Sequence, residues 1–111
     1  MKIQKEKTYY IKLYIAGNIN IAEKLIQNYC DNIGLCVTIL PLNYIYTLGH
    51  EFGMEIGFIN YPRFPTTSKK LFKIAKELGL ILLKELNQQS FSLQTPYNTY
   101  LFNNKKEDNA K

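Results

Sequence analysis

Residues 35–61 read LCVTILPLNYIYTLGHEFGMEIGFINY, and this stretch decides the fold. It begins with a β-rich segment, residues 35–39, which a proline interrupts, so the stretch to Thr47 is expected to be bent, bulged or at a sheet edge. Residues 48–53, LGHEFG, supply two glycines for a hairpin connection. Residues 54–61, MEIGFINY, alternate between apolar and polar and return as the next strand. The stretch therefore predicts an antiparallel hairpin in the middle of the chain.

One strand and one helix are predicted before this hairpin. Residues 8–16, TYYIKLYIA, are rich in β-branched and aromatic residues and predict a strand. Apolar residues then recur at helical spacing from Asn20, the predicted N-cap, to Ile33. Gly34 follows the last periodic residue, which is the position where a glycine ends a helix.

A second helix and two strand-like segments are predicted after the hairpin. Apolar spacing over residues 68–87 predicts a long amphipathic helix. Leu80, Ile81 and Leu83 widen its apolar surface beyond one face, which favours contact with a partner subunit. Residues 90–95 and 98–102 are strand-like.

The order of these elements predicts an α+β fold. Strand, helix, strand, strand, helix and strand give the split βαββαβ, or ferredoxin-like, arrangement: an antiparallel sheet with two helices on one face. The opposite sheet face is then left open, and we expect a ligand or a second sheet to cover it. The fold by itself says almost nothing about chemistry.

The positive charge of the chain lies mostly in its ends. The 111 residues carry a formal net charge of +5, with 14 basic and nine acidic residues. We divide the chain into a polar tail over residues 1–7, one ligand-binding domain over 8–102 and a charged tail over 103–111. The domain carries eight basic and six acidic residues, a balance of +2, so long nucleic acid is a weak candidate partner. No apolar run approaches the ~20 residues that span a bilayer, so we expect a cytoplasmic protein without membrane contact.

Catalytic and metal-binding patterns are weak. The single histidine, His50, precedes Glu51 in the predicted hairpin, where an exposed loop residue is the simpler interpretation than a general base. Glu51 and Glu55 straddle a predicted turn, so they need not share a face. Cys30 and Cys36 are interpreted as reduced core thiols, because one histidine leaves a zinc site short of ligands. We expect no enzyme activity, no metal and no cofactor.

One loop concentrates groups that suit a nucleotide. Asn60, Tyr61, Arg63 and Phe64 offer an amide, a phenol, a guanidinium and a ring in a segment braced by two prolines. Such a set can hold a base edge, a phosphate and a stacked base. The alternative is a strand-to-helix connection in which Phe64 plugs the core and Arg63 is solvated.

A second group of residues supports this hypothesis. Tyr46 shares a face with Tyr44 if their strand is regular. The last strand region contributes Phe91, and the turn near its end contributes Tyr97, Asn98 and Thr99. Asn98 and Thr99 can contact a base or a ribose. A plain core position for Phe91 and a plain turn at Asn98 are the alternatives.

Residues 10–102 resemble the small phage proteins that defeat the Thoeris defence system by sponging its signal. The resemblance lies in KLYIAGN (12–18), GLCVTILPLNYIYTLGHEFG (34–53) and GFINYPRFP (57–65). It implies a non-enzymatic protein that sequesters, without cleaving it, a cyclic ADP-ribose isomer made by TIR-domain proteins, and in some members also cyclic oligonucleotides. It further implies a homo-oligomer, a dimer or a larger assembly built on dimers.

The resemblance also assigns roles to residues. It implies that Arg63 contacts phosphate and Asn98 a base or ribose, and it leaves Phe64, Phe91 and Tyr97 open as the stacking ring. The family's second arginine has no counterpart here, so Lys105 or Lys106 would have to replace it. A ferredoxin-like regulatory or RNA-binding module is the alternative function.

Overall fold

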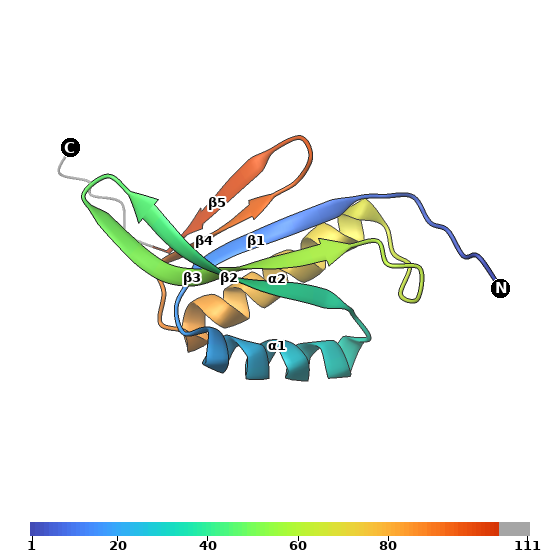
Figure 1. The fold of residues 1–111 in the computed structure, drawn as a ribbon, viewed down its shortest axis with the longest axis horizontal. Helices are drawn as coiled ribbons and strands as arrows, with labels where there is room; N and C mark the ends of the chain where they lie inside the picture. The colour runs from blue at the N-terminus through green and yellow to red at the C-terminus, as the bar shows by residue number, and fades with distance from the viewer. Residues whose placement is uncertain (105–111) are drawn as a thin grey trace.

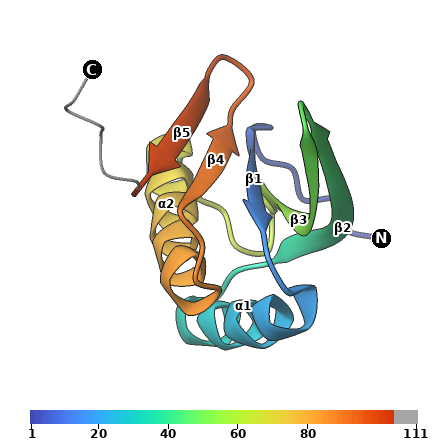
Figure 2. The same cartoon turned by 90° about the vertical axis from the view of Figure 1, so that its left-hand side faces the viewer.

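Five strands form one antiparallel sheet in the order β2-β3-β1-β4-β5, and two helices cover one of its faces (Figures 1 and 2). The computed structural model describes residues 1–104. Its elements, in chain order, are β1 (Tyr10–Ala16), α1 (Ile19–Ile33), β2 (Val37–Tyr46), β3 (Gly49–Ile59), α2 (Ser68–Glu85), β4 (Ser90–Gln94) and β5 (Thr99–Asn103). The predicted α+β, ferredoxin-like arrangement is confirmed, and β5 extends it as an additional edge strand.

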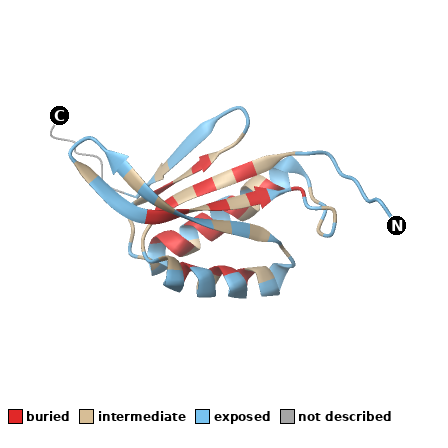
Figure 3. Cartoon of the chain, in the orientation of Figure 1, coloured by how far each residue is buried: buried red, intermediate tan, exposed pale blue. Residues whose placement is uncertain are grey.

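Alternation along β1 separates a buried face from an open one. Ile11, Leu13 and Ile15 are at most 4% exposed and point toward the helices, as the red bands of Figure 3 illustrate. The residues between them face the other way and are only partly covered. Because side chains alternate along a strand, the polar and aromatic residues of β1 lie together on the open face.

Helix α1 begins two residues earlier than the sequence predicted. Asn18, not Asn20, is the N-cap, because its side-chain oxygen accepts hydrogen bonds from the backbone N–H groups of Asn20 (2.8 Å) and Ile21 (3.3 Å). Both residues are asparagines, and the pattern alone did not separate them. Gly34 ends the helix at φ 71°, as predicted.

The central hairpin is longer than predicted, and residues 48–53 are not its connection. Strand β2 runs to Tyr46 and β3 already begins at Gly49, so the turn is formed by Thr47 and Leu48. Gly53 lies within β3, where a Cβ atom would stand 2.6 Å from the Tyr44 ring. The glycine that indicated a turn is therefore required by the close approach of the Ile15 carbonyl oxygen and of the Tyr44 ring.

The apolar surface of α2 serves mainly its own sheet. Leu83 is 8% exposed, Ile81 packs against the core, and Leu80 is 47% exposed. Gly79 lets the helix lie close to β4, since a Cβ atom there would stand 2.3 Å from the Phe91 ring. Two of the three residues, Ile81 and Leu83, therefore pack within the domain and are not surplus, while contact of this helix with a partner subunit stays a prediction.

Apolar residues are exposed instead where the β2–β3 hairpin projects beyond the helices (Figure 1). Ile45, Leu48 and Phe52 are 80%, 102% and 71% exposed. Neither helix of the described chain is long and apolar enough to cross a membrane.

Candidate functional site

Three tyrosines and a carboxylate gather on the open face of the sheet. Tyr44 of β2 lies opposite Glu51 of β3, and Tyr46 and Tyr14 line the same depression. The chain from 87 to 92, which leads into β4, forms the remaining wall. The depression has a volume of about 410 Å³. We call it the tyrosine–carboxylate hollow.

Hydrogen bonds orient the phenol groups of this hollow. The Tyr46 hydroxyl donates to Oε1 of Glu51 at 2.7 Å, and this bond raises the pKa of Tyr46. The Tyr14 hydroxyl donates to Oε1 of Gln94 at 2.8 Å. Burial, and then the nearby Glu55 carboxylate, raise the pKa of Tyr14. Both phenols therefore stay protonated at neutral pH and act as hydrogen-bond donors.

Tyr44 is the most buried of the three phenols. Its hydroxyl donates to the carbonyl oxygen of Met54, which lies opposite Pro41, a residue that has no N–H to offer. Burial raises the pKa of Tyr44 to about 12. The Tyr44 ring is thus fixed against β3 and forms a rigid aromatic wall.

The hollow can therefore hold a compact cation. Aromatic faces attract cations through their quadrupole, and Glu51 adds a carboxylate that is exposed at the rim. Gln88, Gln89 and Ser92 add neutral polar groups that suit hydroxyls or amides of a ligand. Pockets of this size, with few converging polar groups, are typical of small-molecule sites.

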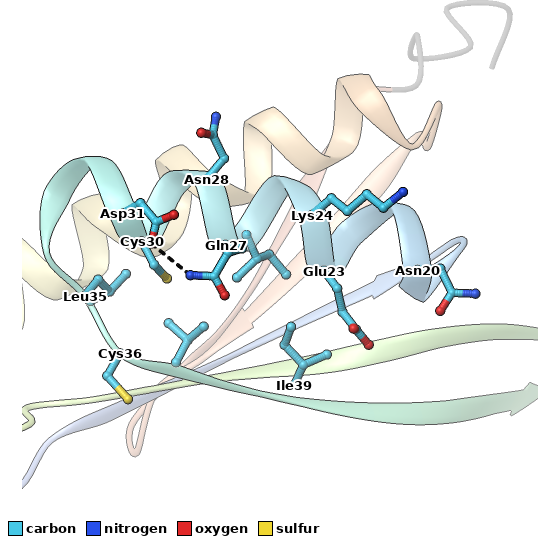
Figure 4. A pocket seen from close by; sticks show the side chains of 12 residues that line it. Asn20, Glu23, Lys24, Gln27, Asn28, Cys30, Asp31, Leu35, Cys36 and Ile39 are labelled. Atoms are coloured by element: carbon cyan, nitrogen blue, oxygen red, sulfur yellow. Dashed lines mark hydrogen bonds between the residues drawn. The ribbon is translucent and has the colours of Figure 1, made fainter.

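A larger hollow of about 820 Å³ lies between α1 and β2 (Figure 4). Its rim carries both an acidic and a basic residue, Glu23 and Lys24, and Gln27 donates a hydrogen bond to Asp31 at 2.8 Å. The polar groups of this hollow therefore do not favour one class of ligand. Cys30 and Cys36 line it and are free thiols. The prediction that both lie in the core is wrong, because Cys30 is partly exposed and Cys36 is exposed. Burial raises the pKa of the Cys30 thiol, which disfavours a reactive thiolate.

The proline-braced loop is placed apart from the tyrosine–carboxylate hollow. Asn60 is 7% exposed and fully occupied, since its amide donates to the Lys7 carbonyl and accepts from the Thr66 N–H, both at 2.8 Å. Arg63 is exposed, and its guanidinium carbon lies 5.7 Å from the centre of the half-buried Phe64 ring. Tyr61 is 39% exposed. Asn60 therefore anchors the loop and the N-terminal segment, and its amide is not available to a base edge.

The remaining predicted site residues divide between the core and the surface. Phe91 is 2% exposed and stacked on Phe102 at 4.8 Å, so its ring faces are not available to a base. Tyr97 is 91% exposed, and Asn98 is also exposed, on the β4–β5 turn, followed by Thr99 at the start of β5. Lys105 lies outside the described residues. Of the predicted residues, Tyr46 and the buried Phe91 are the two that line the hollow.

The sequence did contain a signal for the missed residues. Glu51 and Glu55 were expected to straddle a turn, yet both lie in β3, separated by an even number of positions and hence on the same face. Tyr44 and Tyr46 show the same spacing in β2, and their predicted common face is confirmed, since both line the hollow. Tyr14 was missed because the sequence does not give the register of β1 with β3. That register pairs Tyr14 with Glu55 and places it at the hollow.

The fold is shared with solved structures of a phage enzyme. A phage SAM lyase in its apo state matches with a TM-score of 0.73 at 12% identity over 90% of this chain and 92% of the other. A phage SAM lyase in complex with S-methyl-5'-thioadenosine matches with a TM-score of 0.66 at 11% identity over 93% and 95%. No protein-family model and no curated protein matches the sequence.

These matches correct one prediction. The protein was expected not to be an enzyme, and the two solved structures reported above are of a lyase. At 11–12% identity the likeness shows the fold and assigns no residue.

Proposed function

We propose that the protein is a small-molecule enzyme of phage origin that binds a sulfonium nucleoside, of the S-adenosylmethionine (SAM) class, in the tyrosine–carboxylate hollow. The observation that carries the proposal is the Glu51 carboxylate, held by the Tyr46 hydroxyl at 2.7 Å beside the ring of Tyr44. A sulfonium is a compact cation, and aromatic faces with a carboxylate are the groups that attract one. The shared fold with SAM lyase supports the same substrate class.

The proposed reaction breaks the bond between the sulfonium sulfur and the γ-carbon of the substrate's amino-acid chain. Sulfur keeps the electron pair and leaves as neutral methylthioadenosine. The substrate's own carboxylate oxygen bonds to the γ-carbon and closes a five-membered lactone, so neither water nor an external proton is consumed. This route asks no lining residue to act as a nucleophile, so Glu51 and the tyrosines have only to bind and orient the substrate.

The protein's contribution would be positioning. Glu51 and the tyrosine rings hold the sulfonium, while Gln88 and Gln89 are placed to hold the polar part of the substrate. A chain held in a curled conformation brings the reacting atoms to attack distance.

An anti-defence role is part of the proposal. Removing or converting a small adenosine-containing molecule of the host would serve a phage, and both fold neighbours are phage proteins. A cyclic ADP-ribose isomer, the ligand that the Thoeris resemblance implies, carries an adenosine and two phosphates. Arg63 is not among the residues that line the hollow, so a charged partner for those phosphates would have to come from elsewhere.

We further propose that a second copy of the chain covers the projecting hairpin. Ile45, Leu48 and Phe52 expose apolar surface there, and Leu48 adopts φ 66°, a conformation that costs energy for a residue with a side chain. Native mass spectrometry should return the mass of two or more chains. A Phe52→Ser, Ile45→Ser variant should return one chain; a monomeric parent protein would contradict this proposal.

A matched pair of ligands tests the recognition of a sulfonium. Methylthioadenosine and its S-methylated derivative differ by one methyl group and one positive charge, and neither carries the amino-acid chain. In calorimetric titrations the sulfonium should bind roughly ten- to a hundredfold more tightly, since it alone is attracted electrostatically by the Glu51 carboxylate. Equal affinities would show that the hollow does not select a cation.

A further inference from the structure

A third hollow, of about 490 Å³, lies on the open face of the sheet around Gly57 of β3. Lys12 of β1 and Thr38 of β2 pair with Gly57 from its two sides. Because glycine has no side chain, the space between these two neighbours stays open. A Cβ atom at Gly57 would stand 2.5 Å from the Thr38 hydroxyl oxygen, so this hydroxyl leans over the floor of the hollow. We call it the glycine hollow.

The glycine hollow is separate from the tyrosine–carboxylate hollow. Tyr14 lines the first hollow, and its register partner Glu55 lines the glycine hollow, so this pair forms the boundary between them. Along β3, Glu51 and Gly57 lie about 20 Å apart at ~3.3 Å per residue. A ligand held at Glu51 therefore leaves room for a second ligand over Gly57.

Two opposite charges stand at the edges of the glycine hollow. Of the described residues that line it, Lys12 and Glu55 alone carry a full charge. They are diagonal neighbours across β1 and β3, a relation that places residues about 7–8 Å apart. Within residues 1–104 no ion pair joins them. Both charges are therefore available to a ligand that carries one charge of each sign.

The other end of the hollow is apolar. Tyr10 and Ile59 pair across β1 and β3 and line this end. Ile59 is 49% exposed, and Tyr10 is partly exposed. A ligand with an apolar group would cover this surface and gain from removing it from water.

We infer that the glycine hollow binds a free α-amino acid with an apolar side chain. The ammonium group lies at the Glu55 carboxylate and the Thr38 hydroxyl oxygen, and the carboxylate lies at the Lys12 ammonium group. The apolar side chain packs against Tyr10 and Ile59. A ligand with a single charge would leave one of the two protein charges without a partner, and an uncharged ligand would leave both.

Three related ligands test this inference. L-Phenylalanine carries both charges, phenethylamine lacks the carboxylate, and 3-phenylpropionate lacks the ammonium group. In calorimetric titrations L-phenylalanine should bind about tenfold or more tightly than either analogue, because it alone is attracted by both Lys12 and Glu55. Backbone amide NMR should show that phenylalanine shifts residues 10–12 and 55–59.

Replacing Lys12 with methionine identifies the group that holds the carboxylate. This variant should bind phenylalanine about tenfold more weakly, yet it should bind phenethylamine no more weakly, since that amine has no carboxylate. Lys12 is partly exposed on the open face, so an unbranched apolar side chain should leave the fold intact. Lys24→Met is the matched control, because Lys24 is exposed on α1 and does not line the hollow.

Three outcomes would overturn the inference: equal affinities for the three ligands, unchanged phenylalanine affinity in Lys12→Met, or amide shifts confined to residues 44–51. Glu51→Gln separates it from the proposed function, because that variant should lose sulfonium recognition and keep phenylalanine binding. The S-methylated derivative of methylthioadenosine should not displace phenylalanine from the parent protein. Displacement would contradict a separate site.

Discussion

Replacing Glu51 with glutamine is expected to lower kcat/KM for SAM roughly 10- to 100-fold. The glutamine keeps the size of the side chain and can still accept a hydrogen bond from Tyr46, but it removes the charge that we place beside the sulfonium. A sulfonium has no N–H or O–H, so this is a charge–charge contact: two unit charges about 4 Å apart near a protein surface attract by about 4 kcal/mol before the cost of desolvation. A net loss of about 1.4–2.7 kcal/mol corresponds to this range. The measurement is the initial rate of methylthioadenosine release at several SAM concentrations.

Glu85→Gln is the matched control for this variant. Glu85 ends α2, is exposed and does not line the hollow, so the same change of charge should leave the rate unaltered. Tyr46→Phe should give a smaller loss, because it frees the Glu51 carboxylate without removing its charge. Equal rates for Glu51→Gln and the parent protein would move the reaction away from the tyrosine–carboxylate hollow.

Replacing Phe91 with alanine is expected to cost about 3–5 kcal/mol of the free energy of unfolding, as for other large core rings. The ring is 2% exposed, stacks on Phe102, and fills the space that Gly79 leaves open on α2. Neither the helix nor the neighbouring strand can close that gap without moving as a unit. Urea denaturation of the parent protein and the variant measures the difference.

Tyr97→Ala is the control for the loss of an aromatic ring. It removes a side chain that is 91% exposed and should change the unfolding free energy by less than about 0.5 kcal/mol. If Phe91→Ala were as stable as the parent protein, the packing of α2 against β4 described above would be wrong, and Phe91 would again be a candidate ligand contact.

The sequence predicted the fold because its strongest patterns were local. The alternation in residues 8–16 and the apolar spacing after Ser68 each mark one element, and their order is that of a ferredoxin-like fold. The hairpin was the exception. Gly49 and Gly53 look like turn residues in the sequence, but Gly53 lies inside a strand because the Ile15 carbonyl oxygen and the Tyr44 ring leave no room for a side chain there.

The candidate site was harder to predict because it depends on register. Tyr14 and Glu51 are far apart in sequence, and both reach the open face through pairings of β1 and β2 with β3. The proline-braced loop has the composition of a nucleotide site, yet the Asn60 side chain hydrogen-bonds to the backbone of the loop and of the N-terminal segment. Polar residues that could bind a ligand often form hydrogen bonds within the fold instead.

The prediction of a purely binding protein rested on weak catalytic motifs and on the resemblance to proteins that sequester their ligand without cleaving it. A catalytic histidine, a metal cluster or a glycine-rich loop would have indicated an enzyme, and none was evident. A reaction in which the substrate supplies its own nucleophile needs no such motif. Such a reaction needs a pocket of the right shape, held by hydrogen bonds. The sequence pattern alone does not predict that shape, because it does not give the register of the strands.

Incubation of the protein with SAM, followed by mass spectrometry of the products, tests whether the protein cleaves SAM catalytically. We expect methylthioadenosine and a lactone in equal amounts, both in large molar excess over the protein chain, and a lower rate for Glu51→Gln. Recovery of all the SAM intact, with product never exceeding one equivalent per chain, would contradict it.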